Sequence, residues 1–402
     1  MKKRIISAVL ALVMLFSVCS VSVFAVSNKN LLKFDQNGEF KIMHLTDCQD
    51  KYPANETMLK FIDASIKEYQ PDIVVLGGDN VVADYKDLDA AIKQLVSIFV
   101  QNETYFTLVF GNHDHEHGMT NDELLPLYQK YGGKYCLAYD AKAELHGSAT
   151  HNLPVFSSDG SKIKFNLWMF DSGDYVYDTN GNELGYDCVT KDQIEWYKET
   201  SKALEKTAGG KVPSLAFQHI IVGDVYDALF YEFPFDMGEL TRKTNNGKIY
   251  SMLPKTENII EGFLSEPPCP GYYNFGQFDA MVTRGDVLGI FSGHDHINTF
   301  VTELDGIKIV NTGGCTYNSY GNEVTRGMRM ITLNEDDLWN FETETVTINQ
   351  FAIRNSDFAA NAGVDRAVAT LATGGGYLLL FLGKLAGIVS VLIQDYLASA
   401  LA

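Results

Sequence analysis

The order of apolar and polar positions predicts alternating strands and helices in the first third of the chain. Short apolar runs predict buried strands at residues 40–45, 73–76 and 105–110. Between them, apolar residues recur at helical spacing from Asn55, a good N-cap, to Pro71, and again over residues 88–99. This order predicts a parallel βαβαβ unit with helices on the faces of a sheet.

The second half of the chain repeats this pattern less regularly. Further apolar runs predict strands at residues 163–170, 215–217, 287–291, 300–304, 307–310 and 328–333. Thr190 and Gln193 form a capping box that predicts a helix over residues 191–206. Asp305-Gly306 predicts a tight hairpin. Residues 220–280 show weak periodicity, and a loop of that length is typical of a lid or a substrate wall.

The N-terminus has the pattern of an export signal. Lys2, Lys3 and Arg4 precede an apolar run, and small residues lead to a plausible cleavage point after Ala25. The pattern predicts a signal peptide over residues 1–25 and a secreted or extracytoplasmic protein. Two alternatives remain: an uncleaved membrane anchor, because the apolar run nearly spans a bilayer, and a lipid-modified Cys19.

Polar residues follow five of the predicted strands at the point where each strand ends. These blocks are Asp47-Cys48-Gln49, Gly77-Gly78-Asp79-Asn80, Gly111-Asn112-His113-Asp114, His219 and Gly293-His294-Asp295-His296. The carboxyl ends of neighbouring parallel strands point into one crevice, so the blocks are expected to converge. Any one of these Asp or Asn residues alone would be an ordinary turn residue, but the set predicts a metal site.

The residue types suit a pair of divalent cations. Two neighbouring cations need a shared carboxylate, with imidazoles and amides around it. The candidate ligands are Asp79 between the ions, Asp47 and His296 on one, and Asn112, His219 and His294 on the other. This mixed nitrogen and oxygen set suits manganese, iron or zinc, whereas an all-oxygen calcium site would not need the histidines.

The five blocks resemble the signature of the calcineurin-like metallophosphoesterases: D-x-H, G-D, G-N-H-[DE], an isolated His and G-H-x-H. The match spans about residues 40–335. The local sequence is most similar to a branch related to purple acid phosphatases, in which Asn-x-Gly precedes G-H-D-H, as Asn274-Phe275-Gly276 does here. The resemblance implies an α/β (α+β) sandwich of two packed mixed β-sheets flanked by helices. It places a catalytic domain over residues 30–350.

The resemblance also implies a reaction. Two divalent ions (Mn, Fe, Zn or Mg) would clamp the phosphoryl group, and a metal-bridging hydroxide would attack phosphorus in a phosphomonoester or phosphodiester. His113 would protonate the leaving oxygen or stabilise the phosphoryl charge, and Asp114 is a candidate to orient it. The metals remove the need for a protein nucleophile, so no covalent intermediate is expected.

Two positions depart from the family pattern. Gln49 stands where the first motif has His, and an amide is a weaker ligand for zinc or iron than imidazole, which favours manganese or magnesium. Gln49 therefore keeps open a second hypothesis, a catalytically impaired metal-binding member of the same fold that acts as a binding module. Val82 stands where the purple enzymes have a metal-binding Tyr, so a colourless protein is expected.

The remaining polar candidates receive more ordinary interpretations. His44 lies inside a predicted strand and is expected in the core, while the Cys48 side chain should point away from the metals. The other histidines are expected in loops: His115 and His117 near the rim of the site, and His146 and His151 on the surface.

The composition limits the kinds of ligand and partner expected for this chain. The net charge of −19 and the lack of a basic patch argue against nucleic acid, which leaves a small phosphorylated substrate. Five cysteines follow the signal segment without any CxxC spacing, which argues against a thiolate zinc site. Residues 351–402 form an apolar tail whose run at 377–393 contains Lys384. A helix packed on the domain or on a protein partner, and a membrane contact, both stay open for this tail.

Overall fold

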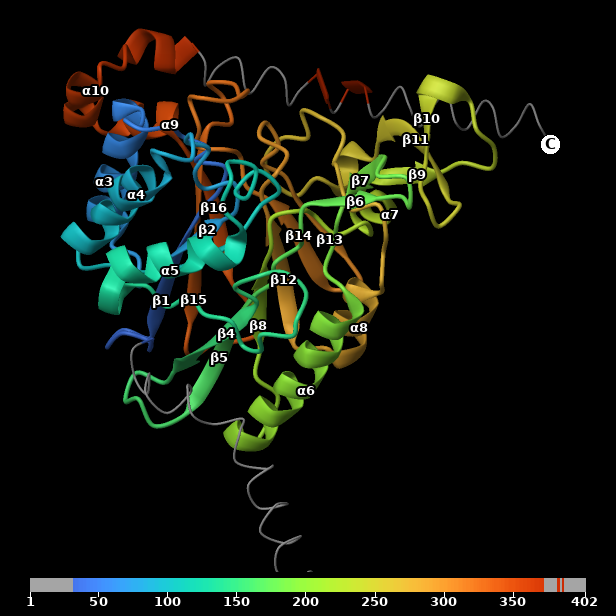
Figure 1. Ribbon diagram of the computed structural model, residues 1–402, viewed down its shortest axis with the longest axis horizontal. Helices are drawn as coiled ribbons and strands as arrows, with labels where there is room; N and C mark the ends of the chain where they lie inside the picture. The colour runs from blue at the N-terminus through green and yellow to red at the C-terminus, as the bar shows by residue number, and fades with distance from the viewer. Residues whose placement is uncertain (1–31, 372–381, 384, 387–402) are drawn as a thin grey trace, which may run out of the picture.

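Two β-sheets pack face to face with helices on both outer faces (Figure 1). The computed structural model describes residues 32–371, 382–383 and 385–386. Both sheets contain parallel and antiparallel pairs, so the predicted sandwich of two mixed sheets flanked by helices is confirmed.

The first sheet carries the predicted βαβαβ unit. Its strand order is β16-β15-β1-β2-β3, and β1 to β3 run parallel. The strands are β1 (Glu39–Leu45), β2 (Ile73–Gly77), β3 (Tyr105–Val109), β15 (Gly327–Asn334) and β16 (Glu342–Thr347). Helices α3 (Glu56–Tyr69) and α4 (Leu88–Gln101) form the crossovers. The Asn55 side chain caps α3 by accepting from the amides of Thr57 and Met58, as its position in the sequence predicts.

The second sheet has the order β13-β14-β12-β8-β5-β4. Its strands are β4 (His151–Phe156), β5 (Ile163–Met169), β8 (Ser214–Phe217), β12 (Val287–Ser292), β13 (Val301–Leu304) and β14 (Ile307–Asn311). Asp305 and Gly306 both have positive φ, which confirms the tight hairpin between β13 and β14. Helix α6 (Lys191–Ala208) begins at the predicted capping box of Thr190 and Gln193.

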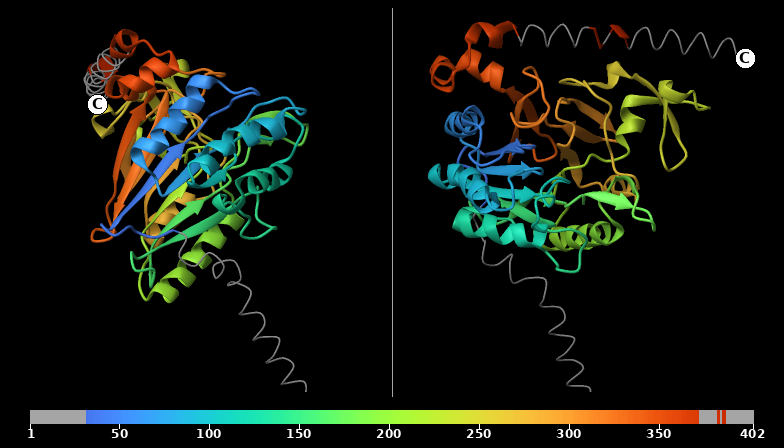
Figure 2. Two further views of the ribbon diagram at one scale, coloured as in Figure 1. Left: turned by 90° about the vertical axis from the view of Figure 1, so that its left-hand side faces the viewer. Right: turned by 45° about the horizontal axis from the view of Figure 1, so that its top comes forward.

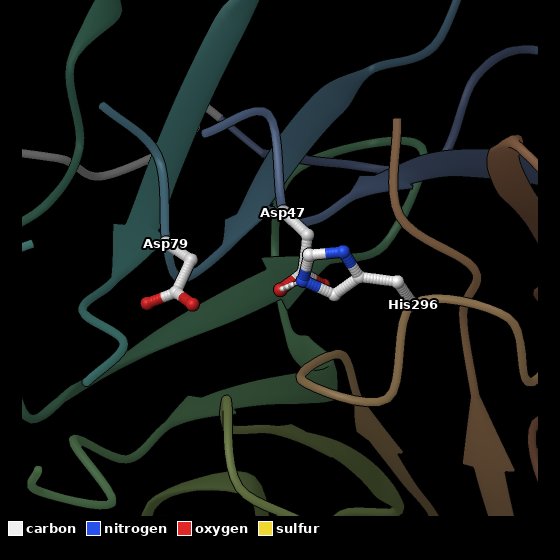
Figure 3. Close-up of side chains that lie close together, drawn as sticks. All are labelled: Asp47, Asp79 and His296. Carbon is white, nitrogen blue, oxygen red and sulfur yellow. Dashed lines mark ion pairs between the residues drawn. The ribbon is translucent and has the colours of Figure 1, made fainter. Parts of the chain in front are cut away.

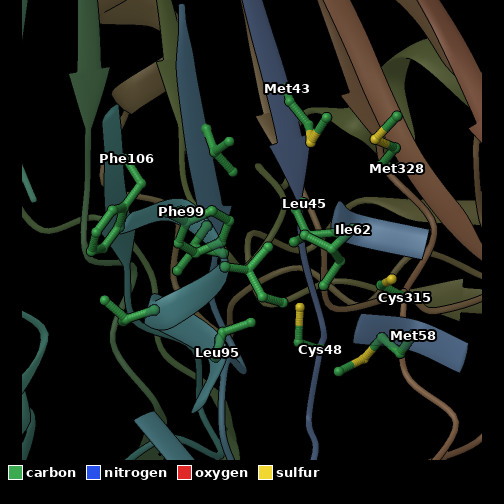
Figure 4. Packing of buried hydrophobic residues seen from close by; sticks show 14 of the residues in the cluster. Met43, Leu45, Cys48, Met58, Ile62, Leu95, Phe99, Phe106, Cys315 and Met328 are labelled. Atoms are coloured by element: carbon green, nitrogen blue, oxygen red, sulfur yellow. The ribbon is translucent and has the colours of Figure 1, made fainter. Parts of the chain in front are cut away.

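Strand alternation divides the apolar side chains between two layers. Ile42, Ile73 and Val75 face the second sheet, where they join one cluster with the stacked pair Phe217 and Phe291. The intervening residues of β1 and β2 face the opposite way, into a cluster beneath α3 and α4 (Figure 4). Strands β1 and β2 are therefore fixed from both faces, which holds the turns at their ends in place.

The structure corrects the expectation of one long loop over residues 220–280. This segment contains α7 (Val225–Leu229), a small sheet of order β10-β11-β9, and α8 (Gln277–Arg284). The small strands are β9 (Phe230–Glu232), β10 (Thr241–Lys243) and β11 (Ile249–Pro254), and the short 3₁₀ turns are η2 (Gly238–Leu240) and η3 (Thr256–Asn258). Two of these strands have three residues each, too few to produce a recognisable period in the sequence.

The sequence analysis also missed several other elements. Helix α5 (Asn121–Gly132) follows the third polar block and leads into η1 (Gly133–Tyr135). A two-stranded hairpin of β6 (Tyr175–Tyr177) and β7 (Glu183–Tyr186) follows β5. This hairpin contributes a side chain to the site described below.

Packing continues beyond Phe351, the point where the family pattern ends. Helices α9 (Ile348–Arg354) and α10 (Ser356–Ala362) lie against α3 (Figure 2). Phe351 packs edge-on against Phe61 and Phe358. The predicted signal peptide, and residues 377–393 apart from 382–383 and 385–386, lie outside the described residues. Among the residues that are described, no helix is both long enough and apolar enough to cross a bilayer.

Candidate metal centre

The ends of β1, β2 and β12 bring two carboxylates and an imidazole together. Asp47, Asp79 and His296 each offer one ligand atom, and these atoms lie within 4.8 Å of one another (Figure 3). All three side chains are buried. Because β1 and β2 belong to one sheet and β12 to the other, the cluster lies where the two sheets meet.

The two oxygens of Asp47 have different surroundings. Oδ2 accepts hydrogen bonds from Thr46 Oγ1 at 2.8 Å and from the His294 amide at 3.0 Å. Oδ1 has no hydrogen bond, although it lies 3.3 Å from His296 Nε2 and 3.9 Å from His219 Nε2. Burial would raise the pKa of Asp47, but the facing imidazoles His296 and His219 outweigh it and lower this pKa. One oxygen is thus fixed by the protein, and the other faces the histidines.

Asp79 lies between the remaining candidates. Its Oδ1 accepts from the His113 amide at 2.8 Å, and its Oδ2 accepts from Gln49 Nε2 at 2.7 Å. His219 Nε2 lies 3.2 Å from the same Oδ2. Burial opposes the charge on Asp79, yet His219 and the hydrogen bonds hold its pKa below the usual range. The carboxylate is therefore ionised and central, as a bridging ligand must be.

Backbone carbonyls fix the rings of His219 and His296. His219 Nδ1 lies 2.9 Å from the Gly77 carbonyl, and His296 Nδ1 lies 2.8 Å from the Tyr320 carbonyl. A carbonyl only accepts, so both Nδ1 atoms must carry hydrogen, and both Nε2 atoms face carboxylates. A neutral ring would point a lone pair at those oxygens, so a proton or a cation must lie between them.

The electrostatics of His219 show what a cation would replace. Burial alone would lower the pKa of His219, but Asp79 and Asp47 raise it to about 10. His294 differs, because burial and the neighbouring His219 lower its pKa to about 3. One ring therefore holds a proton that a metal would displace, and the other is already neutral.

Unsatisfied atoms provide the test of whether cations fit here. Several buried side-chain atoms of the described residues have no hydrogen-bond partner, and three of them belong to the candidate ligands: Asp47 Oδ1, Asn112 Oδ1 and His219 Nε2. Each such atom costs about 1–3 kcal/mol unless something pairs with it. They come from three different strand ends, and two are oxygens and one is an imidazole nitrogen. This donor set fits divalent cations of borderline character.

The backbone of the site occupies unusual conformations. Asp47, Gln49, Asp79 and His294 have φ values of 49°, 36°, 50° and 71°, a region that non-glycine residues seldom occupy. At Gly293 a Cβ atom would overlap Thr46 Oγ1 and the Asp47 carboxylate. Such strain persists where surrounding structure enforces it, typically at functional sites.

Comparison with known proteins agrees with this geometry. The family model described as calcineurin-like phosphoesterase matches residues 40–298. The chain belongs to this family. Its members bind a dimetal centre and act on phosphorylated substrates, and the cluster around Asp79 lies where the family's motifs meet.

Named relatives match most of this chain. The chain is 28% identical to "Probable inactive purple acid phosphatase 14" of Arabidopsis thaliana, over 80% of this chain and 82% of that protein. It is 26% identical to "Probable inactive purple acid phosphatase 29" of the same plant, over 75% and 78%. A solved dimetal phosphatase from Danio rerio is 12% identical with a TM-score of 0.45, covering 76% of this chain and 98% of that one.

The structure places Asp114 differently from the prediction. Its carboxylate accepts from the amides of Gly111 at 2.8 Å and Asn80 at 2.9 Å, so it holds two turns together instead of orienting His113. Burial and the nearby Asp79 raise its pKa to about 7. The carboxylate at His113 Nδ1 is Glu116, at 2.7 Å. Sequence analysis missed Glu116, although it follows His113 by three residues in the same turn.

The other histidines fall into three groups. His44 is a core residue, as expected, with Nδ1 2.8 Å from Thr312 Oγ1. His115 and His117 follow the third block, with His115 3.2 Å from Asp174. His146 is exposed, as expected, and is paired with Asp187 at 2.7 Å.

His151 corrects the surface-loop prediction. It begins strand β4, is fully buried, and lies 2.7 Å from Thr107 Oγ1. Burial lowers its pKa to about 4. Pro154, three residues later, argues against a strand in the sequence. The structure tolerates it because β4 is an edge strand.

Cys48 lies between two site residues but points into the apolar cluster beneath the helices, beside Cys315 (Figure 4). This agrees with the prediction. Both are free thiols, and the contact with Cys315, together with burial, raises the pKa of Cys48 well above the ordinary value.

Proposed function

We propose that this chain is an exported phosphoesterase that uses two divalent cations to hydrolyse phosphomonoesters or phosphodiesters. The observation that carries the proposal is the arrangement of His219 and His296. Carbonyl groups hold both Nδ1 atoms, so both Nε2 atoms are directed at carboxylate oxygens of Asp47 and Asp79. Histidines that ligate metals are oriented in this way.

The residues present divide between two ions. Asp47 and His296 would hold one ion, with Gln49 beside it, and Asn112, His219 and His294 would hold the other, with Asp79 shared. Ions in such a site offset charge on the phosphoryl group and make bound water more acidic. Manganese or magnesium suits the amide of Gln49 better than zinc or iron.

The protein's own groups would act on the leaving group. The His113 amide donates a hydrogen bond to Asp79, which places the ring next to the shared carboxylate. The His113 side chain is about two-fifths exposed. A partly exposed imidazole next to the metal centre can deliver a proton to the leaving oxygen. Tyr186 and Tyr320 pack against His294 and His296, with ring centroids at 4.2 Å and 4.1 Å. They would form the walls of the substrate site.

Location and further contacts are part of the proposal. The basic and apolar N-terminal pattern supports export. The apolar stretch at 377–393 supports a contact of the tail with a membrane or a protein partner. The net charge of −19 supports a small phosphorylated substrate in preference to nucleic acid.

A second function is favoured by one specific observation. Gln49 occupies the ligand position of the family's first motif, and the two Arabidopsis relatives carry the word inactive in their names. A chain that binds metal without turnover would then serve as a binding module. Against this, Asp79, Asn112 and His113 of the motifs are all present and converge.

The test combines metal analysis with an assay of one aryl phosphomonoester and one aryl phosphodiester in added manganese. Wild type should bind two metals per chain and hydrolyse at least one ester. Asp79→Asn should lose metal and at least 100-fold in rate. Asp63→Asn, on the outer helix α3, should behave as wild type. Two bound metals without turnover of either ester would favour the binding module.

A further inference from the structure

A chain of hydrogen bonds joins the side chains of Asn112 and His113 through two residues that no motif contains. Asn112 Nδ2 lies 2.9 Å from the Tyr175 hydroxyl, and that hydroxyl lies 3.0 Å from Glu116 Oε1. The other oxygen, Glu116 Oε2, lies 2.7 Å from His113 Nδ1. One carboxylate therefore contacts both the proposed proton donor and, through a tyrosine, a proposed metal ligand.

The chemistry of Glu116 determines which group donates and which accepts in each of these hydrogen bonds. An ionised carboxylate only accepts hydrogen bonds, so the Tyr175 hydroxyl must donate its single hydrogen to Glu116. That hydroxyl can then only accept from Asn112, which must present its NH₂ group to the tyrosine. The amide oxygen of Asn112 is then the atom left to ligate a cation, and it is buried and without a hydrogen-bond partner.

The same reasoning fixes the ring of His113. Facing Oε2 of Glu116, Nδ1 must carry hydrogen, so Nε2 is the nitrogen left to face a substrate. Asp114 cannot supply this orientation, because its oxygens accept from the backbone of Gly111 and Asn80.

Tyr175 is itself held in place by the other strand of its own hairpin. It comes from β6, and its ring packs against Tyr186 of β7 with centroids 5.6 Å apart. The ring of Tyr186 in turn packs edge-to-face against the ring of His294, with centroids 4.2 Å apart. The β6-β7 hairpin is thus packed against the metal centre through two tyrosines.

We propose that Glu116 and Tyr175 are positioning residues: Tyr175 holds the amide of Asn112 with its oxygen toward the metal, and Glu116 holds both Tyr175 and the His113 ring. This inference rests on the proposed function for the role of His113. Its part concerning Asn112 depends only on metal binding.

Two variants separate the two roles. Tyr175→Phe removes the hydroxyl that accepts from Asn112, so the affinity for the more weakly bound Mn²⁺ should fall about 10-fold or more. Glu116→Gln can donate as well as accept, so the ring of His113 loses its fixed orientation. Here kcat should fall about 10–100-fold with little change in KM.

For Glu116→Gln, the loss of rate should depend on the leaving group of the ester. A purely structural role of Glu116 would give the same loss for every ester. An alkyl phosphate needs its leaving oxygen protonated more than para-nitrophenyl phosphate does, so the loss should be larger for the alkyl ester. Tyr177→Phe, on the same strand but exposed, is the matched control and should leave metal affinity and kcat unchanged. Thermal unfolding checks that each variant is folded.

Each outcome decides something. Wild-type Mn²⁺ affinity in folded Tyr175→Phe would overturn the role of Tyr175. An equal loss on both esters in Glu116→Gln would overturn the role of Glu116. If wild type binds manganese without turnover, the proposed function fails, while the affinity of Tyr175→Phe still decides the orientation of Asn112. A wild type that binds no manganese overturns both proposals.

Discussion

Gln49 Nε2 lies 2.7 Å from Asp79 Oδ2, so an amide donates to the carboxylate at the middle of the candidate metal centre. In the D-x-H motif of the family an imidazole occupies this position. A donor group cannot ligate a cation, so the amide would have to rotate to offer its oxygen. Gln49 is therefore the residue on which the strength of the first site depends.

We expect Gln49→His to raise the affinity for Zn²⁺ by about 10-fold or more, because imidazole is the better ligand for this ion. The measurement is a competitive metal titration. Gln49→Ala is the companion variant, which removes the amide without supplying a ligand. If the His and Ala variants bound Zn²⁺ equally, residue 49 would not be a ligand position.

Gly293→Ala should damage the site and the fold together. A methyl group there would overlap Thr46 Oγ1 and the Asp47 carboxylate. Overpacking of this kind costs about 1–3 kcal/mol in the free energy of unfolding, and displacing Asp47 should also reduce the metal content. Gly210→Ala is the control, since a Cβ atom there meets nothing within 4 Å. Denaturant unfolding and metal analysis of both variants check this, and equal behaviour would contradict it.

The buried His151 should make the protein sensitive to acid. Its pKa is lowered to about 4, against about 6.5 in the unfolded chain, so the unfolded state binds more protons between these values. The contribution of His151 to the free energy of unfolding is fully present above about pH 6.5. It decreases as pH falls toward 4, by up to about 1.4 kcal/mol per pH unit. His151→Gln should flatten this part of the stability curve.

His146 serves as a control because its pKa is shifted in the opposite direction from that of His151. Its hydrogen bond to Asp187 raises its pKa, so its contribution is complete below about pH 6.5 and is lost as pH rises through the raised pKa. His146→Gln should therefore leave the acid limb unchanged. An unchanged acid limb in His151→Gln would show that another group controls it.

Phe351→Ala should destabilise the whole domain by about 3–5 kcal/mol, because Phe351 is fully buried between Phe61 and Phe358. Val368→Ala, at a side chain that is 57% exposed, should change little. Thermal unfolding of the two variants tests whether the folded unit extends beyond residue 350. A small effect of Phe351→Ala would place the boundary where the family pattern ends.

Local signals account for what could be predicted. The βαβαβ unit could be predicted because its strands are short and mostly apolar and because α3 has both a clear helical period and an Asn cap. The convergence of Asp47 and Asp79 followed from the rule that parallel strands of one sheet end at one edge. His296 comes from the other sheet, and the packing of the two sheets brings it to the same place.

Long-range contacts account for what could not. Tyr175 reaches Asn112 across 63 positions, and nothing in either neighbourhood encodes that contact. The small sheet at residues 230–254 escaped prediction because its strands are too short to show a period.

The stacked pair of Phe217 and Phe291 has a consequence for how this centre can change. His219 follows the first ring by two residues and His294 follows the second by three, and the rings lie 5.2 Å apart between the sheets. Interiors are close-packed, so a change in either ring's volume shifts the strands beneath those histidines. Selectivity among cations can therefore drift during evolution through substitutions in the apolar interior, with every ligand unchanged.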